Sequence, residues 1–249
     1  MEPILIYDTT LRDGTQGEDI NFSSTEKVKI AKKLDELGIH YIEGGWPGSN
    51  HRDVRFFELA KMEKFENARI TAFGATRKPG ITAGDDPNLN ALIESQTEAV
   101  AIFGKSWGLH VEQIMSNTRQ ENLDMIRESV AFLKTHDKEV LYDAEHFFDG
   151  YKDDADYAIE TLMAAVDGGA DFLVLCDTNG GTLTSEIESM TTAVRSRLSD
   201  RGLSPRLGIH CHNDCGVAVA NSIAAIQAGA VMAQGTVNGD GGRPALIHL

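Results

Sequence analysis

Eight short apolar runs recur along the 249 residues, and each has the length of a buried strand. Nearly continuous apolarity is typical of parallel strands that are covered on both faces of their sheet. Segments with helix signals lie between the runs, and this alternation over about 250 residues predicts a TIM (β/α)8 barrel. We expect the strands within 3–8, 39–45, 69–74, 99–104, 139–145, 171–178, 206–212 and 231–237.

Helix start and stop signals support the alternation. Ser23 and Glu26 have the spacing of a capping box, and the segment that they begin ends at Gly38. Ser185 and Glu188 repeat this spacing and predict the start of a later helix. Further helices are expected at 154–169 and 217–230, with a shorter one inside 80–96.

A doubly wound open sheet is the alternative fold for such an alternation. No G-x-G-x-x-G motif follows the first apolar run, which counts against this alternative. No linker or low-complexity tract divides the chain, so we expect a single catalytic domain over residues 1–249. Only about a dozen residues follow the eighth run, so we expect the closing eighth helix of the barrel to be missing.

Charge and composition restrict the class of partner. The formal net charge of −15 argues against nucleic acid and against an anionic membrane. No apolar run approaches the ~18–20 residues that cross a bilayer, and the first residues lack the features of a signal peptide. We therefore expect a cytoplasmic protein that acts on small molecules. Three cysteines without a CxxC pair are expected to be reduced and in or near the core: Cys176, Cys211 and Cys215.

Polar side chains gather where the apolar runs end. The carboxyl ends of the strands carry the active site in TIM barrels. This pattern therefore predicts an active site at that end of the molecule. The residues at these ends are Arg12, Asp13, Glu43, Glu145, His146, Asp177, Thr178, His210, His212 and Asn238.

Two of these residues point to metal binding. His210 and His212 stand two apart in a strand, so they share a face while Cys211 points away. An isolated H-x-H pair is more often hydrogen-bonded or solvated, but barrel closure would bring Asp13 beside this one. Two imidazoles and a carboxylate predict a divalent-metal site with open positions, and they suit Zn, Mn, Co or Mg.

Three further residues have both a catalytic and a structural interpretation. Arg12 presents a fork of donors for carboxylate or enolate oxygens, or else forms a surface ion pair. Glu145 acts as a general base, or else makes a structural hydrogen bond to a neighbouring loop. The Thr178 hydroxyl binds a substrate carboxylate, or else caps a helix.

Longer motifs around these residues resemble one family. They are DTTLRDGTQ, EGGWPGSN, YDAEHFFDG, CDTNGGTL and HCHNDCGVAVANSIAAIQAGA followed by QGTVNG. Between positions 7 and 239 the chain resembles the isopropylmalate/homocitrate synthase family of metal-dependent TIM-barrel acyltransferases, the DRE-TIM group. Within it, DAEHFFDGYK is most similar to the citramalate synthase branch.

The resemblance implies a Claisen condensation of acetyl-CoA with a 2-oxoacid, pyruvate above all. The reaction would release CoA and (R)-citramalate in the biosynthesis of branched-chain amino acids such as isoleucine. The resemblance also implies a homodimer. Alternatives are a 2-isopropylmalate or homocitrate synthase, a hydroxymethylglutaryl-CoA-lyase-type aldol cleavage, or a catalytically impaired barrel.

The resemblance also implies roles for individual residues. Arg12 would stabilise charge on the keto oxygen, Thr178 would contact the carboxylate of the 2-oxoacid, and Glu145 would help to remove a methyl proton from acetyl-CoA. Apart from the resemblance, His110 in SWGLHVEQ is a candidate pocket residue that would help to select the 2-oxoacid, with a plain loop histidine as the alternative. The implied metal ligands are Asp13, His210 and His212.

The last residues depart from the family pattern. Gly242 stands where the family has Glu, and Leu246 stands where it has an Asn that is a further metal ligand. We also expect the C-terminal subdomain and the regulatory domain of the family to be missing. We therefore expect a truncated synthase barrel whose activity depends on the part that is missing.

Overall fold

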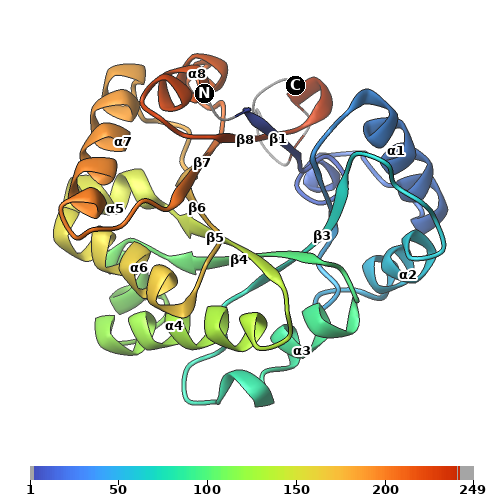
Figure 1. The fold of residues 1–249 in the computed structure, drawn as a ribbon, viewed down its shortest axis with the longest axis horizontal. Coiled ribbons are helices and arrows are strands. Elements are labelled where there is room, and N and C mark those ends of the chain that lie inside the picture. Colours follow the sequence, from blue (N-terminus) through green and yellow to red (C-terminus); the bar gives the residue numbers. More distant parts are fainter. Residues whose placement is uncertain (1–2, 240, 242–249) are drawn as a thin grey trace.

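The computed structural model describes residues 3–239 and 241, and these form a closed barrel of eight parallel strands (Figure 1). The strands pair in sequence order, and β1 also pairs with β8, which closes the sheet. The predicted TIM barrel is confirmed. The strands are β1 (Leu5–Asp8), β2 (Tyr41–Gly45), β3 (Arg69–Ala75), β4 (Ala99–Lys105), β5 (Glu139–Glu145), β6 (Phe172–Asp177), β7 (Arg206–Cys211) and β8 (Met232–Gly235).

Helices surround the sheet as an outer layer, and an additional short helix, α5, separates β5 from α6 (Figure 1). No helix of the described part is both long and apolar enough to cross a membrane. A closing helix after β8 would fall on 240–249, of which only 241 is described, and Gly242 and Leu246 also lie outside the described residues. The helices are α1 (Ser24–Leu37), α2 (His51–Ala60), α3 (Pro87–Glu94), α4 (Arg119–Lys134), α5 (Phe147–Asp153), α6 (Ala155–Gly168), α7 (Thr184–Ser199) and α8 (Ala218–Gln227).

The capping box predicted for α1 is confirmed. The Ser23 backbone N–H donates to the Glu26 carboxylate at 2.8 Å, the Ser23 hydroxyl accepts from Glu26 N at 3.3 Å, and the helix ends at Gly38 with φ +88°. Glycine suits this left-handed position because it lacks a Cβ.

The second predicted capping box is wrong. Helix α7 begins at Thr184, and the Glu186 carboxylate accepts from Leu183 N at 2.9 Å. Glu186 is also ion-paired with Lys152 at 3.0 Å, which holds its carboxylate at this end of the helix. Ser185 therefore lies inside the first turn instead of capping it.

Alternation along the strands divides the apolar residues into two cores. Tyr7, Phe73, Leu141 and Phe172 belong to the cluster inside the barrel, whereas most other apolar side chains pack between the sheet and the helices. Cys211 lies in the outer cluster, as its predicted orientation requires.

The three cysteines are free, but they do not share one environment. Cys176 and Cys211 are buried, as expected. The prediction that all three lie in or near the core is wrong for Cys215, which is exposed in the loop after β7.

A buried carboxylate fastens α1 to the segment before β3. Asp35 is 4% exposed and accepts hydrogen bonds from the backbone N–H groups of Glu66, Asn67 and Ala68 at 2.8–2.9 Å. Burial opposes the charged form, but these three donors outweigh it and lower the pKa of Asp35 below its usual value. The ionised form therefore stabilises the fold.

We predict that Asp35→Asn lowers the free energy of unfolding by about 2 kcal/mol at pH 7, because an amide NH2 then faces backbone donors. A lowered folded-state pKa stabilises the protein above the unfolded pKa, about 3.9, and this stabilisation is lost as the pH falls through the folded value. Urea unfolding at pH 7 and pH 3 should show the difference shrinking at pH 3. Asp167→Asn, at an exposed position of α6, is the control; a difference that does not change with pH would contradict the prediction.

Candidate metal centre and active site

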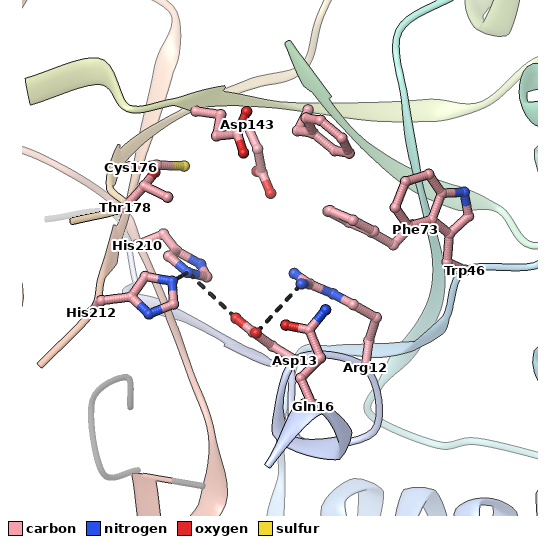
Figure 2. Close-up of a pocket in the computed structure, with 12 residues that line it drawn as sticks. Arg12, Asp13, Gln16, Trp46, Phe73, Asp143, Cys176, Thr178, His210 and His212 are labelled. Carbon is pink, nitrogen blue, oxygen red and sulfur yellow. Dashed lines mark hydrogen bonds and ion pairs between the residues drawn. The ribbon is translucent and has the colours of Figure 1, made fainter. Parts of the chain in front are cut away.

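A cavity of about 430 Å³ opens at the carboxyl ends of the strands, where the sequence predicts the active site. One side of it is polar and the facing side is aromatic (Figure 2). The lining residues are Arg12, Asp13, Gln16, Trp46, Phe73, Phe103, Asp143, Glu145, Cys176, Thr178, His210 and His212.

The three predicted metal ligands meet in this cavity. One ligand atom from each of Asp13, His210 and His212 lies within 4.8 Å of the others. His210 Nε2 is 3.3 Å from His212 Nε2 and 3.7 Å from Asp13 Oδ2 (Figure 2). In residues 3–239 and 241, no other group of His, Cys, Asp and Glu side chains converges in this way.

The chemistry of these three residues fits a divalent cation. His210 Nδ1 is engaged by the Gln234 side chain at 2.8 Å, so the other ring nitrogen faces Asp13 and His212. Burial, together with the neighbouring His212, lowers the pKa of His210 below its usual value, so its imidazole is neutral at pH 7. A neutral imidazole is the form that binds a metal.

Arg12 forms an ion pair, but the pair is buried in the cavity wall, not at the surface. Its Nε donates to the fully buried Glu43 carboxylate, which also accepts from the Tyr7 hydroxyl at 2.8 Å. The guanidinium carbon lies 3.8 Å from the Phe73 ring centroid, and Nη1 is 3.6 Å from Asp13 Oδ1. Arg12 is therefore held beside the predicted ligands with its fork at the cavity.

Glu145 and Thr178 line the cavity and also make structural contacts. Glu145, at the end of β5, is ion-paired with Lys105 at the end of β4. The Thr178 hydroxyl accepts from His146 N at 2.8 Å and so joins the loops after β5 and β6. The helix-capping alternative for Thr178 is wrong, because the next helix begins only at Thr184.

The structure places His110 outside the cavity lining. Its ring stacks on Trp107 at 4.8 Å between centroids and contacts the His146 ring edge at 4.4 Å. His110 begins the turn 110–114 beyond β4, and His146 connects it to Thr178. The loop conformation that decides this placement cannot be read from local spacing.

Sequence reasoning missed several residues of the site. Asp143 lies two residues before Glu145 on β5, and Gln234 is the register partner of His210 on β8. The same two-residue alternation that singles out His210 and His212 also selects Asp143. Burial and the nearby Glu43 raise the pKa of Asp143 to about 8. The remaining missed residues are Gln16, Trp46, Phe73, Phe103 and Cys176.

The chain belongs to the family described as HMGL-like, whose model matches residues 3–248. It is 53% identical to the (R)-citramalate synthase of Aquifex aeolicus over 248 residues, which are 100% of this chain and 46% of that protein. The (R)-citramalate synthase of Geobacter sulfurreducens is also 53% identical, over 98% of this chain and 45% of the relative. The chain thus spans about half the length of these curated relatives.

More distant comparisons agree with this placement. The 2-isopropylmalate synthase of Sulfurisphaera tokodaii is 33% identical over 96% of this chain and 58% of that protein. The HMG-CoA lyase structure from Bacillus subtilis superposes with a TM-score of 0.80 at 19% identity, over 98% of this chain and 80% of that one. This last likeness shows the shared fold. The resemblance to the citramalate synthase branch is confirmed by relatives of that name at 45–53% identity.

We predict one divalent cation per chain, bound through Asp13, His210 and His212. Alanine at any of the three should weaken Co²⁺ or Zn²⁺ binding by more than about 100-fold in calorimetric titration. Cation at about 100 times its Kd should raise the free energy of unfolding by about 2.7 kcal/mol. His136→Ala, at an exposed site after α4, is the matched control; equal binding by control and ligand variants would refute the assignment.

Proposed function

We propose that the chain is the barrel of an (R)-citramalate synthase, an acyltransferase that condenses acetyl-CoA with pyruvate and releases CoA. The observation that carries this proposal is the convergence of Asp13, His210 and His212 beside Arg12, which is ion-paired with the buried Glu43. The identity of 45–53% to (R)-citramalate synthases supports it, because it extends over nearly the whole barrel.

Asp13, His210 and His212 would hold a divalent ion: Zn, Mn, Co or Mg. Such an ion supplies Lewis acidity, which stabilises negative charge on a substrate oxygen. Arg12 would bind the keto oxygen of the 2-oxoacid and stabilise the charge that develops there. Glu43 and Phe73 fix the guanidinium in advance, so little reorganisation is needed as the charge forms.

The remaining polar residues would orient the two substrates. Thr178 would contact the carboxylate of the 2-oxoacid. Glu145 would accept a methyl proton from acetyl-CoA, with Lys105 holding its carboxylate at the cavity rim. His110 contacts the ring of His146, whose backbone N–H donates to Thr178, so any contribution of His110 to substrate binding would be indirect.

The aromatic side of the cavity favours a small 2-oxoacid. Trp46 contacts the Phe73 and Phe103 rings edge-on, both at 5.7 Å between centroids, and the two phenylalanines stack at 5.6 Å. These mutually packed rings limit the space beside Arg12. The methyl group of pyruvate fits such a wall better than a branched side chain does, which supports citramalate over isopropylmalate as product.

Several broader properties belong to the same proposal. Residues 1–249 would act as a single catalytic domain within a cytoplasmic homodimer, in the biosynthesis of isoleucine and other branched-chain amino acids. The motif resemblance supports the pathway and the dimer, and the net charge of −15 is consistent with small-molecule partners. The product of the reaction would be (R)-citramalate.

We predict that the barrel supports pyruvate-dependent release of CoA from acetyl-CoA. The free-thiol assay should use this chain alone and also in place of the matching part of the Aquifex aeolicus enzyme, because the chain covers 46% of that protein. The joined protein should release CoA with pyruvate, and Arg12→Ala or His210→Ala should lower the rate at least ~100-fold. His136→Ala should leave it unchanged. A folded, cation-binding joined protein that acts on no 2-oxoacid, or only cleaves a hydroxyacyl-CoA, would disprove the proposal.

We predict that Phe103→Ala shifts the preference toward larger 2-oxoacids. Removing one ring of the aromatic wall makes room for additional methyl groups, and each is worth about 1–3 kcal/mol in such a pocket. In the joined protein, kcat/KM for a branched 2-oxoacid relative to pyruvate should rise at least ~10-fold. Phe132→Ala on α4 is the control. An unchanged ratio would show that this wall does not select the substrate.

A further inference from the structure

A chain of three buried polar side chains runs through the wall beside the predicted metal ligands. His210 Nδ1 is 2.8 Å from Gln234 Oε1, and Gln234 Nε2 donates to Asp143 Oδ1 at 3.3 Å. The three residues are 6%, 0% and 4% exposed, respectively. The strand register sets the first contact, because His210 on β7 is paired with Gln234 on β8.

The chemistry of the Gln234 amide fixes which group donates and which accepts in each of these two hydrogen bonds. A glutamine side chain donates only through its NH2 group and accepts only through its oxygen. Asp143 Oδ1 accepts from the NH2 group whether the carboxyl is ionised or protonated at its other oxygen. In the orientation that the structure gives the Gln234 amide, its NH2 group faces Asp143 and its oxygen faces His210, so Nδ1 of His210 carries the hydrogen that this oxygen receives.

The position of this hydrogen decides what the other ring nitrogen can do. In a neutral imidazole with a hydrogen on Nδ1, Nε2 has a lone pair and no hydrogen. That nitrogen is the atom 3.7 Å from Asp13 Oδ2. Two electron-pair donors that face each other without a hydrogen between them repel, and a cation placed between them relieves this repulsion.

We propose that Gln234 and Asp143 are positioning residues that hold His210 in its Nδ1–H form and so present its Nε2 lone pair to a metal ion. This inference builds on the metal site of the proposed function and does not depend on the identity of the 2-oxoacid. Neither residue needs to touch substrate for this role. Asp143 acts through Gln234, and Gln234 acts through His210.

Two substitutions of Gln234 separate this role from simple packing. Gln234→Met keeps the length of the side chain but removes the acceptor, so Co²⁺ affinity should fall ~10–100-fold, with a changed visible spectrum of the Co²⁺ complex. Gln234→Glu keeps an acceptor for Nδ1–H, so its affinity should stay close to that of the wild type. Packing alone predicts the opposite order, because Met fills the site without burying a charge.

Nitrogen-15 NMR of the His210 ring tests the hydrogen position directly, before and after Zn²⁺ is added. The wild type and Gln234→Glu should carry the hydrogen on Nδ1 without metal, whereas Gln234→Met should lose this preference. Thr191→Val, a buried isosteric change on α7, is the control for folding and should change neither readout. Gln234→Met with wild-type affinity and ring signals, or Gln234→Glu weaker than Gln234→Met, would overturn the proposal.

The outcomes also separate this inference from the proposed function. If Gln234→Met binds Co²⁺ more weakly than Gln234→Glu but the joined protein releases no CoA, the positioning role stands and the synthase proposal is rejected. A wild-type ring with its hydrogen on Nε2 would reject the positioning role, whatever the activity of the barrel.

Discussion

The pairing of β1 with β8 is the contact on which the site depends. It joins residues more than 220 positions apart, with Tyr7 opposite Gln234 and Asp8 opposite Gly235. Asp13 lies in the loop after β1, whereas His210 belongs to β7, so only a closed sheet can bring the two within 3.7 Å. In an open sheet, β1 and β8 would not be neighbours and the carboxylate would be far from the imidazoles. The convergence of these predicted metal ligands therefore requires the barrel to close.

The inside of the barrel mouth is polar at a cost in stability. Glu43 is fully buried, and its carboxylate is satisfied by Arg12 and Tyr7. Buried ion pairs add little net stability because desolvation offsets their attraction, but removing one partner costs about 3–5 kcal/mol. This pair therefore fixes the position of Arg12 instead of adding stability, because moving the guanidinium away would leave the buried Glu43 carboxylate without its cation. An active site commonly keeps such an arrangement where an apolar core would be more stable.

Patterns of neighbouring residues in the sequence were enough to predict those features that depend only on local backbone geometry. The eight strands, the Ser23 cap and the shared face of His210 and His212 all follow from spacing along the chain. Adding barrel topology was enough to place Asp13. The partnership of Gln234 with His210 and Asp143 depends instead on the register between strands, which no single segment encodes.

The errors have the same origin. The sequence offered both Glu186 and Glu188 near the start of α7, and the ion pair with Lys152 from another helix favours Glu186.

The place of Phe73 in the aromatic wall has a consequence for how such a site can diverge. Its ring supports the Arg12 guanidinium at 3.8 Å and also stacks on Phe103. In the proposed synthase, a mutation at Phe73 that enlarged the pocket would also loosen the Arg12 guanidinium, so gains in substrate range would be offset by losses in rate. Phe103 lies on the next strand, β4, and does not stack on Arg12, so in the proposed synthase a substitution there could widen the pocket without removing the support of the arginine.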